Sequence, residues 1–306
     1  MRVCIVGCGA VGSLFAASLA RLDDVDVWAY DLDAEHVRAV NENGLRLSGA
    51  GELVGHLRAT TDASELPPCD FGIVATKSMH TDAALRAAAH ALAGGSVCSV
   101  QNGVGNEETI AEHVPSVIRG TTFPAGRIVE PGHVQWDVSG DTTIGPFEPS
   151  PAPTEEIERL AEACTRAGMP TQAVADARGP QWRKVIFNAA TNPVGALTGL
   201  THGQVCEDES LRRLVSVLVD EGKAVAGAQE IELDADPEEL IDYAARPDVA
   251  YGHKASMLQD VEARRQTEID YLNGGIVRFG REHGVSTPLN EAVVALVKGL
   301  ELSWQR

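Results

Sequence analysis

One polar face on an otherwise apolar segment is the feature of this chain that most suggests chemistry. The stretch QWRKVIFNAATNPVGAL, residues 181–197, has the pattern of an apolar helix. Lys184, Asn188 and Asn192 lie four residues apart in it, so they would share one face of that helix. A surface cation and a polar helix face would explain each residue taken alone. Three such residues on one helix face instead favour a polar ligand, and the remaining motifs indicate which ligand it is.

A glycine-rich turn opens the chain. RVCIV predicts a short strand and SLFAASLARL predicts a helix, and between them stands GCGAVG, which matches the pattern G-x-G-x-x-G. Such glycines permit a tight turn, a close approach of the backbone to a pyrophosphate, and close packing of helix on strand. The helix N-terminus then offers free N–H groups to the phosphates. We therefore expect a dinucleotide to bind at Gly7, Cys8, Gly9, Ala10, Val11 and Gly12.

An acidic residue follows the second predicted strand. VDVWAY is followed by Asp31, nineteen residues after Gly12. A carboxylate at this position accepts hydrogen bonds from ribose hydroxyls and repels a 2′-phosphate, which favours NAD(H) over NADP(H). The alternative is that Asp31 only caps the helix that follows.

Two further apolar runs, at 71–76 and 96–100, have the spacing of parallel strands buried on both faces. Ligands of such sheets bind beyond the carboxyl ends of the strands. The polar segments KSMHT and QNGVGNEE begin there, so Lys77 and Asn102 should border the cofactor. An ordinary turn would also explain QNG.

The pattern changes in the second half of the chain. Residues 121–145 predict antiparallel strands appended to the sheet. After residue 180 the apolar period is about 3.6 residues, which predicts helices at 181–191, 207–227, 237–245, 253–264, 267–283 and 288–301. PFEPSPAP, 146–153, resembles a linker, but a helix-start pattern at Thr154 makes it a loop. We therefore predict an α/β Rossmann-type, dinucleotide-binding domain at 1–177 and an all-helical substrate and catalytic domain at 178–306.

Composition excludes several classes of function. The 306 residues carry a net charge of −19, which argues against a nucleic-acid or anionic-membrane partner. No apolar run approaches the ~18 residues of a membrane span, and the start lacks a secretory signal, so we expect a cytoplasmic protein. The six Cys and nine His show no metal-binding spacing, so we expect no metal site.

Five motifs together resemble a known family. GCGAVG, QNGVGNEE, WRK…N…NPVGAL, SMLQD and TEIDYLNG occur in the order and spacing of the ketopantoate reductases (2-dehydropantoate 2-reductases), and the resemblance covers essentially the whole chain. That family has a Rossmann-type domain followed by a helical domain. It reduces the ketone of a 2-keto acid with a nicotinamide hydride, usually from NADPH. The resemblance thus implies an oxidoreductase of pantothenate biosynthesis with ketopantoate as the leading substrate.

The resemblance also implies roles for individual residues of the helical half. Lys184 is similar to the family's catalytic lysine, a general acid that protonates the keto oxygen as hydride reaches C2. Asn188 and Asn192 would hold the substrate's hydroxyl and carboxylate. Ser256 resembles the serine that donates to that carboxylate.

Two residues would contact both substrate and cofactor by the same resemblance. Glu268 matches an acidic residue that helps to position the substrate and the nicotinamide end. Asn102 would complete the site from the cofactor domain. Second domains of this helical kind often dimerise, so a homodimer is possible.

The chain departs from the family pattern in ways that keep two alternatives open. Tyr30-Asp31 stands where a basic residue usually reads the 2′-phosphate of NADPH, and Trp136 and Asp137 stand where the family is small and glycine-rich. The first alternative is an NAD-dependent 2-hydroxy acid dehydrogenase of the same family for a different, bulkier 2-keto acid. The remote alternative is a non-catalytic dinucleotide sensor, which predicts loss of Lys184 or Glu268, and both are present.

Overall fold

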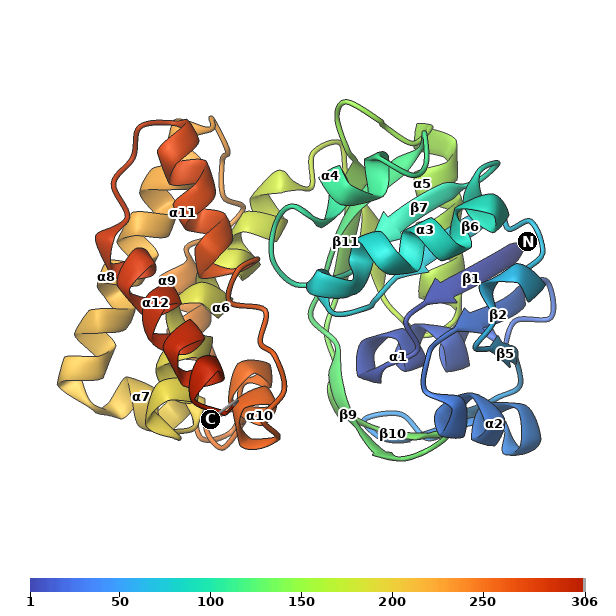
Figure 1. The fold of residues 1–306 in the computed structure, drawn as a ribbon, viewed down its shortest axis with the longest axis horizontal. Coiled ribbons are helices and arrows are strands. Elements are labelled where there is room, and N and C mark those ends of the chain that lie inside the picture. The colour runs from blue at the N-terminus through green and yellow to red at the C-terminus, as the bar shows by residue number, and fades with distance from the viewer. Residues whose placement is uncertain (305–306) are drawn as a thin grey trace. The chain divides into compact units, whose positions relative to one another are not determined.

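The computed structural model describes residues 1–304, and the chain divides into two compact units (Figure 1). The first unit contains residues 1–101 and 106–177. The second contains residues 102–105 together with the chain from Arg178 onward. Four residues between two parts of the first unit thus pack with the second unit.

An eight-stranded sheet forms the centre of the first unit, in the order β12-β11-β8-β7-β6-β1-β2-β5. Neighbouring strands pair in parallel except β8 and β11, which are antiparallel. The predicted fold class, a mostly parallel Rossmann-type sheet followed by helices, is confirmed. The strands are β1 (Arg2–Val6), β2 (Asp26–Tyr30), β5 (Arg58–Thr60), β6 (Phe71–Val74), β7 (Ser96–Ser99), β8 (Val117–Thr122), β11 (Thr142–Pro146) and β12 (Thr171–Ala173).

Helices cover both faces of this sheet because its central strands are apolar on both sides. In β1, Val3 and Ile5 pack in a cluster with α1 and α5, whereas Cys4 and Val6 pack in another with α3 and α4. The helices are α1 (Ala10–Leu19), α2 (Ala34–Asn43), α3 (Thr81–Leu92), α4 (Asn106–Ala111) and α5 (Thr154–Arg166), with short 3₁₀ turns η1 (Ala63–Glu65) and η2 (Ser78–His80).

The strands expected at 121–145 divide between two sheets. β8 and β11 belong to the main sheet, but β9 (Ala125–Glu130) and β10 (His133–Val138) join β3 (Leu45–Gly49) and β4 (Leu53–Gly55) in a separate four-stranded sheet. β10 pairs in parallel with β3, and Val134 and Trp136 of β10 are buried in the cluster that contains α1. Alternation predicts a strand, but it does not identify the strand's partner.

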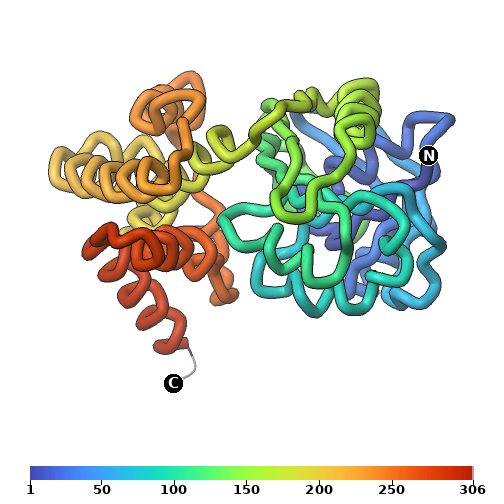
Figure 2. The backbone as a smooth tube through the Cα atoms, turned by 90° about the horizontal axis from the view of Figure 1, so that it is seen from above, coloured from blue at the N-terminus to red at the C-terminus, as the bar shows by residue number. Residues whose placement is uncertain are grey.

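The second unit is helical, and no strand follows Ala173 within residues 1–304. Figure 2 shows its helices from yellow-green to red. They are α6 (Arg178–Thr198), α7 (His202–Glu207), α8 (Glu209–Ala228), α9 (Pro237–Ala244), α10 (Ser256–Glu262), α11 (Asn273–Glu282) and α12 (Pro288–Ser303). α6 contacts α7, α8, α9, α10 and α12, so it is the central helix of this unit. In residues 1–304 we find no helix whose length and apolar character would let it cross a membrane.

Two helix predictions were wrong at their boundaries. The helix expected at 267–283 begins only at Asn273, and residues 263–272 after α10 are irregular, with turns at 263–264 and 269–272. Glu268 therefore lies in a turn and not at a helix start. Ile269 and Leu272 are buried, and hydrogen bonds from Tyr271 N to Glu268 O and from Gly274 N to Ile269 O hold them in consecutive turns. The apolar helix predicted on 181–197 is α6, but the shorter span 181–191 given by the helical period was wrong, because the helix runs from Arg178 through Pro193 to Thr198.

Candidate active site

The polar face predicted from the sequence lies on α6. Asn188 and Asn192 are buried, with 8% and 5% of their surface exposed, and Lys184 is partly buried. Four-residue spacing on a continuous helix places the three side chains on one side of α6. Their burial argues against the explanation that they are ordinary surface residues.

Lys184 is held by an amide from the 102–105 segment. Its Nζ donates a hydrogen bond to Asn102 Oδ1 at 2.8 Å. The segment is fixed against the second unit, because Val104 N donates to Tyr271 O at 3.0 Å. Gly103 has φ +86°, and a Cβ there would lie 2.6 Å from Tyr271 O, so only glycine fits. Asn102 was expected to border the cofactor and to complete the site from the cofactor domain, and its bond to Lys184 places it beside the predicted catalytic lysine.

The surroundings of Lys184 change its acidity. Burial lowers the pKa of Lys184 to about 8, and the negative charge of Glu268 opposes this fall. Glu268 is itself buried, with 5% exposed. A lysine with this pKa gives up and regains a proton near neutral pH, which arginine cannot do. The site can therefore act as a proton donor.

The structure does not join every predicted residue of the second unit to this group. Lys184, Asn102 and Glu268 are linked by the hydrogen bond and by charge. Ser256 is the first residue of α10 and is exposed. In residues 1–304 no group of three or more His, Cys, Asp or Glu could hold a metal ion.

The glycine loop of the first unit has the shape of a phosphate cradle. A Cβ on Gly7, whose φ is +89°, would lie 2.6 Å from Thr76 Cγ2, and a Cβ on Gly12 would lie 2.0 Å from Gly7 O. A Cβ on Gly9 would meet nothing within 4 Å. Gly9 is also the N-cap of α1 and offers no side-chain hydrogen bond to it. The loop thus leaves open space at the uncapped N–H groups of a helix, which fits a pyrophosphate.

Asp31 connects this loop to the end of β2. Its Oδ2 accepts from Cys8 N at 2.6 Å, and its Oδ1 accepts from Asp33 N at 2.9 Å. Asp33, and not Asp31, caps α2, by accepting from the N–H groups of Glu35 and His36. The capping alternative for Asp31 is therefore wrong. Each carboxylate oxygen has a second lone pair, so Asp31 can still accept from ribose hydroxyls.

Two polar residues that support the loop were not predicted. Ser13 Oγ donates to Cys8 O at 2.9 Å. The buried Gln101 donates from Nε2 to Thr76 O at 3.0 Å and to Thr81 Oγ1 at 2.7 Å, and so fixes the residue that packs on Gly7. Lys77 follows Thr76 and is partly buried. The amide in QNG was the available sequence clue to Gln101, since an amide directly after a buried strand needs partners.

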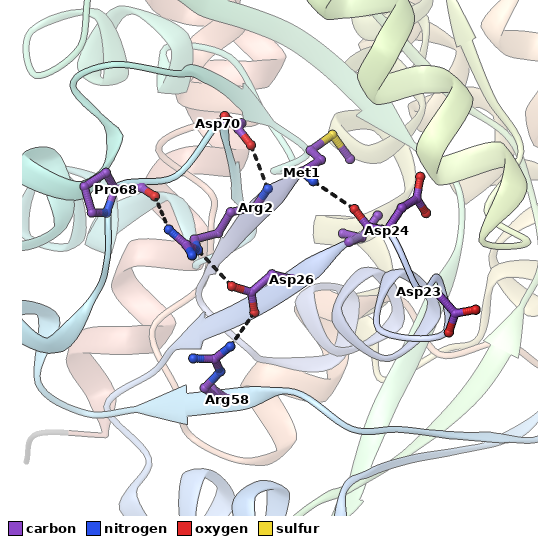
Figure 3. Close-up of a pocket in the computed structure, with 9 residues that line it drawn as sticks. Met1, Arg2, Asp23, Asp24, Asp26, Arg58, Pro68 and Asp70 are labelled. Carbon is purple, nitrogen blue, oxygen red and sulfur yellow. Dashed lines mark hydrogen bonds and ion pairs between the residues drawn. The ribbon is translucent and has the colours of Figure 1, made fainter.

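A hollow of about 590 Å³ lies at the amino ends of β1 and β2 (Figure 3). Several of its charged groups are paired within the chain: Asp26 accepts from Arg2 Nε at 2.8 Å and from Arg58 Nη2 at 2.9 Å, and Asp70 accepts from Arg2 N at 2.7 Å. The glycine loop follows the opposite, carboxyl end of β1, where ligands of such sheets bind. We therefore assign the hollow no part in the chemistry.

Comparison with known proteins gives consistent matches along the chain. Residues 3–149 match the family model "Ketopantoate reductase PanE/ApbA", and residues 176–301 match "Ketopantoate reductase PanE/ApbA C terminal". A 2-dehydropantoate 2-reductase of Pyrococcus abyssi is 35% identical over 302 residues, 98% of each chain. A ketopantoate reductase structure from Ralstonia eutropha JMP134 is 31% identical, with a TM-score of 0.88 and 100% of both chains covered. The structure of D-mandelate dehydrogenase with NADH and anilino(oxo)acetate is 27% identical, with a TM-score of 0.90 and the same coverage.

The geometry of the glycine loop predicts that two similar substitutions affect different properties, one the stability and the other dinucleotide binding. Gly12→Ala should lower the free energy of unfolding by about 1–3 kcal/mol, because its Cβ would overlap Gly7 O. Gly9→Ala should leave that free energy nearly unchanged but weaken dinucleotide binding, because its methyl group occupies the open space. Denaturant unfolding and NADH titration would measure the two effects. Equal losses of stability in both variants would contradict this division.

Proposed function

Because the chain belongs to the ketopantoate reductase family, as its motifs predicted, we propose that it reduces 2-dehydropantoate to pantoate with a hydride from NAD(P)H. The observation that carries the proposal is the Lys184–Asn102 pair, in which a lysine with a pKa of about 8 is held in one orientation by an amide. The curated relative at 35% identity supports ketopantoate as the substrate. The alternative of a different 2-keto acid is not favoured.

Lys184 serves as the general acid in this proposal. The glycine loop would hold the dinucleotide, whose nicotinamide would supply the hydride for C2 of the keto acid. Lys184 Nζ has three hydrogens, so it can donate one to Asn102 Oδ1 and another to the keto oxygen. That second hydrogen bond stabilises the negative charge that develops on the oxygen, and the proton then passes along it to give the hydroxyl.

The remaining residues bind and orient the substrate. Asn188 and Asn192 follow Lys184 by one and two helical turns, so their amides can hold the hydroxyl and carboxylate of the substrate. Ser256 donates to the same carboxylate. Glu268 helps to position the substrate and the nicotinamide end, and its charge keeps the pKa of Lys184 from falling further.

We propose NADH as the preferred cofactor, although the family usually uses NADPH. Asp31 accepts a hydrogen bond from Cys8 N of the glycine loop and places a negative charge at the end of β2. This charge would repel a 2′-phosphate. A structural neighbour at 27% identity, D-mandelate dehydrogenase, has been described with NADH.

The proposed function is tested by following the oxidation of NADH and NADPH with a panel of 2-keto acids that includes ketopantoate. Wild-type protein should turn over ketopantoate most efficiently. Lys184→Ala and Lys184→Arg should each lower kcat by a factor on the order of 10² or more, because neither side chain can supply the proton. Turnover close to wild type in either variant would exclude Lys184 as the general acid.

The pH dependence of reduction should report the pKa of Lys184. The protonated form is the donor, so kcat/KM should fall as pH rises through about 8. Glu268→Gln removes the charge that raises this pKa and should move the fall to lower pH. Asp270→Asn is the matched control, since Asp270 pairs with Lys298 at 2.7 Å and is exposed. An unmoved fall in Glu268→Gln would contradict the coupling.

Asp31→Asn tests the cofactor proposal. Asparagine keeps an acceptor for Cys8 N but removes the charge, so the ratio of kcat/KM with NADPH to that with NADH should rise on the order of tenfold, about 1.4 kcal/mol of removed repulsion. Asp33→Asn, which keeps the cap of α2 while also removing a charge, should change the ratio less. A wild-type protein that strongly prefers NADPH would refute the preference.

A further inference from the structure

Pro193 creates a gap in the hydrogen bonds of the helix that carries the proposed site. It lies inside α6, one residue after Asn192. In an α-helix the N–H of residue 193 would donate to the carbonyl of Ala189, but proline has no N–H. Ala189 is buried, so its carbonyl needs another donor.

Asn273, the first residue of α11, supplies that donor. Its Nδ2 lies 2.8 Å from Ala189 O, and the residue has no exposed surface. Nδ2 also donates to Asn290 Oδ1 at 2.9 Å, and Asn290 Nδ2 donates in turn to Glu221 Oε2 at 2.7 Å. A reversed Asn273 amide would bring its oxygen against two other oxygens, so this network fixes the orientation of the side chain.

The Asn273 side chain also has an unfavourable feature that a residue needed only for packing would not have. With the amide in this orientation, Asn273 Oδ1 is buried and has no hydrogen-bond partner among residues 1–304. An apolar residue of similar size would fill the space without that unsatisfied acceptor. The two donations from Nδ2 are therefore what an asparagine contributes at this position.

We propose that Asn273 is a positioning residue that replaces the missing N–H of residue 193 and so fixes the geometry of α6 between Asn188 and Asn192. Ala189 directly follows Asn188, and Pro193 directly follows Asn192. The missing helical hydrogen bond, between residues 189 and 193, thus spans the segment between the two amides proposed to bind the keto acid. The consequence for substrate binding rests on the proposed function, whereas the hydrogen-bond replacement does not.

A double-mutant cycle tests the replacement directly. In Pro193→Ala, residue 193 regains an N–H that can donate to Ala189 O. Asn273→Ala alone should lower the denaturant midpoint, and Pro193→Ala introduced into that variant should restore part of the loss, so that the double variant is more stable than the sum of the single effects predicts. Additive effects would overturn the replacement. If Asn273→Ala does not fold, a folded double variant supports it, and failure of both overturns it.

Kinetics test the positioning role. Asn273→Ala should raise KM for ketopantoate about tenfold, lower kcat less, and leave the Kd for NADH within about twofold. Asn41→Ala is the control in the first unit, because it also removes an amide-to-carbonyl bond, from Asn41 Nδ2 to Ala59 O at 2.7 Å, together with the bond from Ala59 N to Asn41 Oδ1 at 2.9 Å. It should change neither KM nor the effect of Pro193→Ala. An unchanged KM in Asn273→Ala would overturn the positioning role of Asn273.

The two proposals can fail independently. A wild-type protein that reduces no 2-keto acid would refute the proposed function, while the double-mutant cycle would still decide whether Asn273 replaces the missing N–H of residue 193.

Discussion

A lysine that donates a proton near neutral pH must be partly removed from water and must still have a hydrogen-bond acceptor. Burial alone would leave an ammonium group unsatisfied, and a carboxylate in direct contact would raise its pKa again. Asn102 supplies the acceptor without raising the pKa, since its amide oxygen accepts from Lys184 Nζ and carries no net charge. Glu268 acts on the same lysine by its charge and limits the fall of the pKa to about 8. Burial and the charge of Glu268 thus set the pKa of Lys184, while Asn102 supplies an acceptor that adds no charge.

Both partners of Lys184 depend on one backbone contact. Val104 N donates to Tyr271 O, and Tyr271 N donates to Glu268 O. The segment that carries Asn102 and the turn that carries Glu268 are thereby held against each other within the second unit. Gly103 and Gly105 have φ of +86° and +101°, which side-chain-bearing residues rarely adopt. The glycines of QNGVGNEE thus have a purpose beyond an ordinary turn, because they bring Asn102 to Lys184.

Features that depend on neighbouring residues could be predicted from the sequence, and features that depend on distant contacts could not. The apolar runs and the glycine spacing predicted the parallel sheet, and the helical period predicted most helices of the second unit. The pairing of β10 with β3 and the turns around Glu268 depend on tertiary contacts that leave no periodic pattern. The sequence alone does indicate that one carbonyl of this helix lacks its donor, because a proline lies within a helical run. It does not indicate that Asn273 supplies the donor, since that depends on the packing of α11 on α6.

Asp31 links cofactor choice to the integrity of the glycine loop. The carboxylate that would face the ribose also accepts from Cys8 N, while Ser13 Oγ donates to Cys8 O and Gly7 N donates to Tyr30 O at 2.8 Å. Arginine at position 31 would supply a charge for a 2′-phosphate, but it has no acceptor for the Cys8 N–H. Such a change would therefore alter phosphate recognition and release the loop at the same time. A chain with this loop that binds the 2′-phosphate needs a separate acceptor for the N–H of residue 8, so the two properties must change together.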